Sequence, residues 1–204
     1  TQITSGIRAI LSHPKVYMAV QNLMGAQKAQ RRFVNEFIKP FPGMRILDIG
    51  CGPADILNHL TNVDYYGFDI SEPYIKHAKA KFHDKGNFYC QELCLSDFEE
   101  LPPFDVVLAI GLLHHLDDPI AINVLNLAAK ALKPNGRLLT LDPCLEPRQN
   151  PVARFLIKQD RGRNVRNSKE YSQLASTIFD SFRIEIRHQS WIPYTHCFME
   201  CTAP

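Results

Sequence analysis

The residues best suited to chemistry lie in one short stretch, from Arg45 to Leu57. An apolar run ends there in Asp48 and passes into a tight turn containing Gly50 and Gly52, before a helix is expected to begin. A strand that stops at glycines and leads into a helix is typical of the first βα unit of an open α/β sheet, where ligands bind at the carboxyl ends of the strands. Glycine is needed where a side chain would hold a ligand away from the backbone. The stretch therefore predicts a small-molecule site around Asp48 and the two glycines.

A second acidic residue, Asp69, follows Asp48 by 21 positions and ends the next expected strand. An acid at that place accepts hydrogen bonds from the ribose hydroxyls of an adenosine, which suits either NAD or S-adenosylmethionine. The dinucleotide pattern Gly-x-Gly-x-x-Gly needs a third glycine where this chain has Asp55, whose carboxylate would lie near the diphosphate. S-adenosylmethionine carries an ammonium and a sulfonium but no phosphate. The charges therefore favour S-adenosylmethionine over a dinucleotide.

Apolar runs and turn signals divide the rest of the chain into alternating strands and helices. The expected strands are 45–49, 65–70, 87–91, 104–110, 137–142, 182–188 and 191–201. The expected helices are 3–39 with a boundary at Pro14, 54–61, 71–83, 118–132 with Asp118 as its cap, and 168–179. The alternation breaks over 143–168, which holds three prolines and a cluster of basic residues.

This order of elements predicts the fold class. Strands that alternate with helices over 45–142 indicate a right-handed, doubly wound parallel sheet. The last two strands, 182–188 and 191–201, lie too close for a parallel return, which needs a crossover of about a dozen residues. The prediction is an α/β fold with a doubly wound, mostly parallel seven-stranded sheet that ends in an antiparallel C-terminal hairpin.

The chain length predicts a single domain over 1–204. Its expected parts are an N-terminal helical cover (1–42), a cofactor-binding core (43–142) and a substrate insert with the closing hairpin (143–204). A cover over the carboxyl end of the sheet would bring Tyr17 towards a ligand. Plain packing of these helices on the sheet edge is the alternative.

Composition limits the class of protein. The chain is 45% hydrophobic and 22% charged, as in ordinary globular proteins, and its net charge of +2 does not indicate nucleic acid. No apolar run approaches the roughly 18 residues of a membrane span, and the first residues do not resemble a secretory signal. Six cysteines form no Cys-x-x-Cys pair and lack the partners of a zinc site, so we expect no metal. Reduced thiols indicate a cytoplasmic location.

Four motifs carry a resemblance to a known family. They are LDIGCGPA (47–54), YYGFDIS (65–71), FDVVLAIGLLHHLDD (104–118) and LKPNGRLLTLD (132–142). In this order and at these spacings the sequence resembles the class I S-adenosylmethionine-dependent methyltransferases over most of its length. The resemblance implies a Rossmann-like fold and an enzyme that converts S-adenosyl-L-methionine to S-adenosyl-L-homocysteine.

The resemblance also implies roles for residues at the strand ends. The methionine end would lie on Asp48 and the glycine turn, the ribose on Asp69, the adenine against Ile70, and the methyl group beside the end of the fourth strand. The adenine amino group would meet either Glu92 with Leu93, which the spacing favours, or Asp97. The implied cofactor-binding residues are Asp48, Gly50, Cys51, Gly52, Asp69, Ile70, Glu92, Leu93, Ile110 and Gly111.

Two histidines are candidates for catalysis. His114 and His115 follow the fourth strand, and imidazole titrates near neutral pH, so either one is a candidate general base. A base is required only if the acceptor must lose a proton. The pattern Leu-His-His-Leu is common in this superfamily without being catalytic, so packing or cofactor lining is the favoured alternative.

Two further pairs are candidates for acceptor binding. Tyr194 and His196 share one face of the hairpin and would contact substrate if that face is turned to the site. Arg161 and Arg163 lie in the basic segment after the fifth strand, where arginines can bind a carboxylate or phosphate with two hydrogen bonds. The alternative for the arginines is a solvated surface. Together these residues favour a small-molecule acceptor, with an anionic one as the specific hypothesis.

Two other functions compete with this prediction. A nucleic-acid methyltransferase acting on tRNA or rRNA would use the basic segment on phosphates, but the chain lacks the Asn/Asp-Pro-Pro-Tyr/Phe signature and a strongly basic balance. Nucleic acid is therefore not expected as a partner. A protein that binds the cofactor without transferring methyl would carry the same motifs. The motifs contain no information about the acceptor or the oligomeric state.

Overall fold

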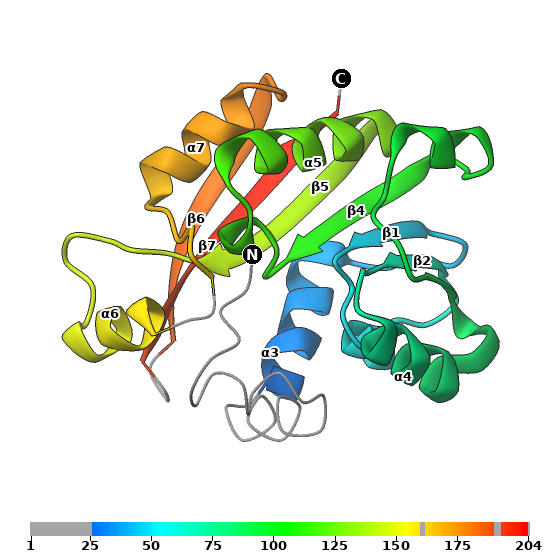
Figure 1. Cartoon of the computed structure of the whole chain (residues 1–204), viewed down its shortest axis with the longest axis horizontal. Helices are drawn as coiled ribbons and strands as arrows, with labels where there is room; N and C mark the ends of the chain where they lie inside the picture. Colours follow the sequence, from blue (N-terminus) through cyan, green and yellow to red (C-terminus); the bar gives the residue numbers. More distant parts are fainter. Residues whose placement is uncertain (1–25, 160–161, 190–192, 204) are drawn as a thin grey trace.

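The computed structural model describes residues 26–159, 162–189 and 193–203. In these ranges seven strands form one sheet in the order β3-β2-β1-β4-β5-β7-β6 (Figure 1). The strands are β1 (Arg45–Ile49), β2 (Asp64–Phe68), β3 (Asn87–Tyr89), β4 (Phe104–Ile110), β5 (Leu132–Pro143), β6 (Ser181–Gln189) and β7 (Tyr194–Thr202).

The sheet has the predicted directions. The first five strands are parallel, and β7 runs antiparallel to both β5 and β6. Strand β4 lies in the middle because its apolar run suits burial on both faces, and Val107 and Leu108 have no exposed surface. The strand order reverses between β1 and β4. A ligand crevice is expected at the carboxyl ends of these two strands.

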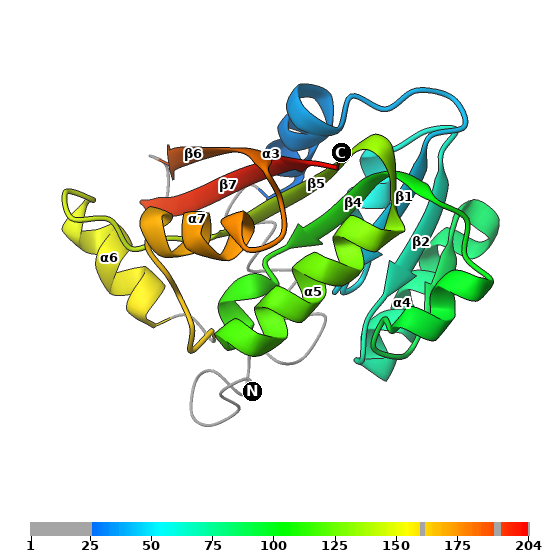
Figure 2. The same ribbon diagram turned by 90° about the horizontal axis from the view of Figure 1, so that it is seen from above.

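Helices cover both faces of the sheet, as the alternating pattern predicts (Figure 2). On one face pack α5 (Asp118–Ala131) and α7 (Ser168–Ser176), whose apolar side chains share one buried cluster with the sheet. The other face buries α4 (Glu72–Phe82), α3 (Ala26–Phe33) and the π-helical turn η1 (Val34–Ile38). None of the helices in the described ranges has the length and apolar character to cross a membrane.

The segment after the glycine turn differs from the prediction. Instead of a helix over 54–61, the chain forms only the 3₁₀ turn η2 (Asp55–His59). It begins after Ala54, which adopts a left-handed conformation with φ of 55°, and it ends where Leu60 becomes extended.

The break over 143–168 contains a helix that the prediction missed, α6 (Pro151–Lys158). The side chain of Asn150 caps it by accepting a hydrogen bond from Val152 N at 2.8 Å, and Pro151 occupies the first turn. At α5 the same kind of signal was placed one residue too late. The cap is Asp117, which accepts from Ile120 N, and not Asp118.

Candidate active site

The glycine turn after β1 opens onto empty space. Gly50 and Gly52 have φ of 73° and 53°, a conformation that side chains other than glycine rarely adopt. The amides of Gly50 and Cys51 both donate to the Phe68 carbonyl, at 2.8 and 3.0 Å, which ties the turn to the end of β2. A methyl group on Gly50 would approach Leu112 Cδ1 within 2.9 Å, whereas one on Gly52 would meet no atom within 4 Å. The side of the turn at Gly52 therefore faces open space.

Asp48 sits behind this turn in a buried pair with a tyrosine that sequence reasoning missed. The Asp48 side chain is 4% exposed, and Tyr65 Oη donates to its Oδ2 at 2.5 Å. Burial raises the pKa of Asp48 to about 7; the Tyr65 hydrogen bond opposes this shift and the nearby charge of Asp69 adds to it. The carboxyl is therefore poised between its neutral and charged forms near neutral pH.

Two glycines make room for the ring of Tyr65. A Cβ on Gly67 would lie 3.0 Å from Tyr65 Cε1 and 2.8 Å from Cys51 Sγ. A Cβ on Gly86 would lie 3.1 Å from Tyr65 Cδ1. Glycine is needed at both positions because a side chain would not fit, and not because of the backbone conformation. Gly86 is extended and neither residue has a positive φ. The pattern Tyr-x-Gly at 65–67 was the signal available in the sequence.

Asp69 lies at the end of β2 and is fixed by backbone groups. Its two carboxylate oxygens accept from Gly52 N at 2.9 Å and Ser71 N at 2.7 Å. Burial raises the pKa of Asp69 despite these two hydrogen bonds. The next side chain, Ile70, is 70% exposed. The Asp69 carboxylate and the exposed Ile70 side chain thus lie next to each other beside the glycine turn.

The end of β4 is also open. Ile110 is half-buried, and Gly111 follows it with φ of 66°. A Cβ on Gly111 would meet only His114 Cε1, at 3.9 Å. Since β1 and β4 are neighbours in the sheet, the open sides of Gly52 and Gly111 lie on adjacent strand ends.

The two candidates for the adenine amino group differ in the hydrogen bonds that they already make. Asp97 caps the 3₁₀ turn η4 (Leu95–Glu99): its carboxylate accepts from Cys94 N at 2.7 Å and from Gln91 Nε2 at 2.9 Å. Glu92 is exposed, and the Leu93 side chain is packed in the core, which leaves its backbone for a ligand. The Asp97 carboxylate is thus already used within the turn, and the choice between the two stays a prediction.

The histidine pair occupies the 3₁₀ turn η5 (Leu113–His115) after β4. His114 is buried, and its Nδ1 lies 2.8 Å from Oδ1 of the buried Asp142, which also accepts from His114 N at 3.1 Å. His115 is half-buried with its ring centroid 4.0 Å from that of His114. The Asp142 carboxylate therefore bonds both the backbone and the ring of His114 and orients the imidazole.

Arg166, another arginine of the basic segment, holds this turn in place. Its guanidinium is buried and donates to the carbonyls of Leu113 and Leu116, at 2.8 and 2.7 Å, and to Asp118. Gly162 packs against the same turn, since a Cβ there would overlap the His114 ring and lie 2.7 Å from its carbonyl oxygen. Part of the basic segment is therefore structural, and Arg163 is exposed.

The hairpin pair lies at the same edge of the sheet. The rings of Tyr194 and His196 are 4.9 Å apart on one face, and His196 pairs with Pro143 at the carboxyl end of β5. Tyr194 lines a hollow of about 320 Å³ together with Arg148 and His188.

Comparison with known proteins identifies the family. A family model described as a methyltransferase domain matches residues 40–190. The chain belongs to the class I S-adenosylmethionine-dependent methyltransferases. The 27-O-demethylrifamycin SV methyltransferase of Amycolatopsis mediterranei is 38% identical over 117 residues, which cover 52% of this chain and 40% of the relative.

Two more comparisons extend the likeness of this methyltransferase domain. Cyclopropane mycolic acid synthase 2 of Mycobacterium tuberculosis is 31% identical over 97 residues, which cover 46% of this chain and 32% of that protein. The crystal structure of a mycolic acid cyclopropane synthase with SAH and CTAB has the same fold, with a TM-score of 0.62 and 20% identity over 81% of this chain and 64% of that one. The chain thus spans less than half the length of these two curated relatives.

The methyltransferase site fits the family's cofactor by its own geometry. Two carboxylates, Asp48 and Asp69, and the exposed apolar side chain of Ile70 lie beside the glycine turn, a set of groups that suits a cationic adenosine ligand. The space left open at Gly52 and Gly111 is what a cofactor lying across these strand ends requires.

The structure brings together most of the predicted site residues, and sequence reasoning missed three that support them. The strand ends of β1, β2 and β4 and the hairpin face meet at one edge of the sheet. Tyr17 and Arg161 lie outside the described residues. The missed supporting residues are Tyr65, Asp142 and Arg166.

Proposed function

We propose that this methyltransferase transfers a methyl group from S-adenosyl-L-methionine to a small acceptor held at the carboxyl edge of the sheet. The observation that carries the proposal is the pair of carboxylates, Asp48 and Asp69, beside the open space at Gly52. When bound, the donor supplies a methyl group activated by its sulfonium. The protein's task is to hold the acceptor in line with that methyl group, which contributes several kcal/mol to lowering the barrier.

Each residue of the cofactor site has a chemical role in this proposal. Asp48, in its ionised form, pairs with the ammonium of the methionine end. Asp69 keeps lone pairs for the ribose hydroxyls while its backbone contacts fix its direction. Ile70 covers the adenine, and Gly111 lets the methyl end approach the backbone of β4.

The acceptor is proposed to be small and anionic. Arg163 is exposed, and Arg161 precedes it by two residues, so both are assigned to an acceptor carboxylate or phosphate. Tyr194 and His196 contribute a ring face, and Tyr17 is assigned to the cover. His114 or His115 is the proposed general base if the acceptor must lose a proton, and Asp142 orients the His114 ring.

The first experiment measures binding and transfer separately. Calorimetry with S-adenosyl-L-methionine and with NAD tests the cofactor, and Asp69→Asn is expected to weaken only the former. Transfer of a labelled methyl group to anionic small molecules, neutral small molecules and tRNA then tests the acceptor class. Binding without transfer to any acceptor would overturn the catalytic role, and salt-sensitive transfer to tRNA would overturn the small-molecule assignment.

A double variant tests the anionic acceptor itself. Arg161→Ala with Arg163→Ala is expected to raise KM for anionic acceptors while leaving cofactor affinity unchanged. Unchanged turnover of every accepted substrate would exclude the anionic hypothesis.

Two broader assignments go with this proposal. We assign 143–204 to acceptor binding and 43–142 to cofactor binding within one domain. The six free thiols support a reducing compartment, so the cytoplasm is the proposed location.

A further inference from the structure

Helix α6 presents apolar side chains that nothing in the described structure covers. Ala153 and Ile157 are buried where the helix packs against β7. Val152 and Phe155, three residues apart and therefore on one face, are 53% and 62% exposed. Leu156 beside them is half-buried. A short helix that exposes its larger apolar residues indicates a surface with a partner.

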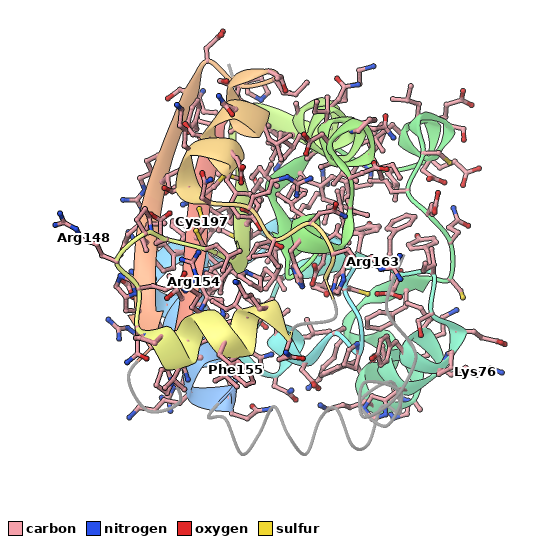
Figure 3. All side chains as sticks on the ribbon, turned by 60° about the vertical axis from the view of Figure 1, so that its left-hand side comes forward. Lys76, Arg148, Arg154, Phe155, Arg163 and Cys197 are labelled. Atoms are coloured by element: carbon pink, nitrogen blue, oxygen red, sulfur yellow. The ribbon has the colours of Figure 1, made fainter. Side chains whose placement is uncertain are left out.

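Basic side chains flank this apolar face, and the acids that bound it in the sequence are Glu146 and Asp160. Arg148, Arg154 and Lys158 are exposed, and residues 147–159 contain no Asp or Glu. The preceding acid, Glu146, is turned inward: its carboxylate accepts from Ser168 N at 2.9 Å and from the Cys144 thiol. Figure 3 shows Arg148 extending away from the body of the molecule.

Helix α6 lies at the same end of the sheet as the candidate site. The helix follows β5 and lies beyond the carboxyl end of the sheet (Figures 1 and 2). Gly111 and the histidine turn lie at the carboxyl ends of the neighbouring strands. A partner on α6 would therefore lie at the end of the sheet that carries the candidate site.

We propose that the α6 surface, defined by Val152, Arg154, Phe155 and Lys158, docks this protein on an anionic lipid membrane. Lipid headgroups supply negative charge and the acyl boundary takes up apolar side chains, a combination that matches a helix with cations flanking an apolar face. The inference concerns where the protein works, and it stands apart from the proposed transfer reaction.

Charge argues against two other occupants. A second copy in a two-fold contact would bring the same basic patch against itself, which costs free energy through repulsion. Residues 1–25 contain Arg8 and Lys15 but no Asp or Glu, so this segment offers no opposite charge. An anionic lipid surface satisfies both the charge and the apolar face.

The test is co-sedimentation of the whole chain with vesicles. We expect binding to phosphatidylcholine vesicles that contain phosphatidylglycerol and little binding to phosphatidylcholine alone. Phe155→Glu is expected to weaken binding by about tenfold or more, because it removes an apolar side chain that would enter the membrane and adds a charge that anionic lipids repel. Arg154→Gln with Lys158→Gln is expected to weaken it by roughly fivefold for each charge removed.

Matched controls change the same residue types elsewhere. Phe41→Glu alters another exposed phenylalanine, before β1, and Lys76→Gln with Lys79→Gln removes two charges from α4, where Figure 3 shows Lys76 at the far side from α6. Both controls should bind vesicles like the unaltered protein.

Three results would overturn the proposal. The first is absence of binding to anionic vesicles. The second is an equal loss of vesicle binding in the α6 variants and in their controls. The third is a change of molar mass in light scattering on Phe155→Glu without a change in vesicle binding. The last result would identify a second copy as the occupant. Cofactor affinity, measured by calorimetry on the same variants, should remain unchanged, so failure of the docking surface is distinguishable from failure of the methyl-transfer proposal.

Discussion

At the scale of single residues, the pair Asp48–Tyr65 controls the charge of the cofactor site. A buried carboxyl without a cation is held partly neutral, and the phenol of Tyr65 supports its charged form with a hydrogen bond. A cationic ligand requires the charged form. Under the proposed function, binding of the ammonium and loss of a proton from Asp48 are therefore linked.

This linkage predicts a pH-dependent affinity for S-adenosyl-L-methionine. With the pKa of Asp48 at about 7, affinity should fall as pH drops below that value and level off above it. Binding at pH near 6 should release a proton, which calorimetry in buffers of different ionisation enthalpy detects.

Tyr65→Phe should extend this effect. Without the phenol the pKa of Asp48 rises further, so the loss of affinity moves to higher pH. Tyr66→Phe is the matched control, because Tyr66 packs on Phe104 and does not contact Asp48. Equal pH profiles for the two variants would contradict the role of Tyr65.

A second residue-scale prediction concerns Gly162. Gly162→Ala places a methyl group against the ring and carbonyl of His114 and should cost about 1–3 kcal/mol of stability, with reduced turnover as the turn shifts. Gly43→Ala is the comparison, since Gly43 has φ of 79° but no atom within 4 Å of an added Cβ. Thermal unfolding and turnover of both variants separate the clash from backbone strain.

At the scale of elements, the histidine turn η5 depends on Arg166. Three carbonyls and the Asp118 carboxylate accept from this guanidinium. Asn164 N also donates to the His114 carbonyl at 3.0 Å, so the segment after α6 fixes the position of both histidines.

Removing this anchor should be costly. Arg166→Leu leaves buried carbonyls without donors and is expected to lower the free energy of unfolding by roughly 2–4 kcal/mol. Arg163→Leu, three residues earlier and exposed, should change it by less than about 0.5 kcal/mol. Urea denaturation measures both, and similar losses would show that the two arginines do not differ as proposed.

The elements also show what the sequence could predict. The positions and directions of the strands followed from apolar runs, acid-bearing strand ends and the short turn before β7, because these signals are local. The ring of Tyr65 reaches Asp48 only because β1 pairs with β2. Arg166 is buried because its guanidinium donates to backbone carbonyls of the distant turn η5. Neither contact can be read from local sequence. Helix α6 was overlooked although Asn150 and Pro151 carry a local signal, since the basic residues around it were interpreted by charge alone.

At the scale of the whole molecule, charges join the N-terminal helix to the sheet. Glu200 on β7 accepts from Arg137 on β5 and Arg183 on β6, both at 2.7 Å. Arg137 also donates to the carbonyls of Phe37 and Ile38 at the end of η1. One carboxylate thus links three strands and, through Arg137, a helix end.

These charges predict an optimum in the pH dependence of stability without cofactor. Burial acts to raise the pKa of Glu200, but hydrogen bonds from Arg137 and Arg183 outweigh it and hold the pKa below its usual range. The stability that this gives is present above the unfolded-state pKa and is lost as pH falls through the folded value. Asp48 has the opposite sign: its raised pKa makes stability decline as pH rises from its ordinary acidic value towards about 7.

Unfolding midpoints in urea from about pH 3 to 8 should therefore peak at mildly acidic pH. Glu200→Gln should flatten the acidic arm, and Asp48→Asn should flatten the arm towards neutral pH. An unaltered acidic arm in Glu200→Gln would show that other carboxyls carry it.

The slot that receives the ring of Tyr65 has a consequence for how this sequence can drift over evolutionary time. Positions 65, 67 and 86 share one small volume, so an exchange at any one of them alters what the other two can tolerate. A homologue with a short side chain at 65 is free to carry larger residues at 67 and 86, whereas one that keeps tyrosine should keep both glycines. Residues at the three positions are therefore expected to covary among homologues.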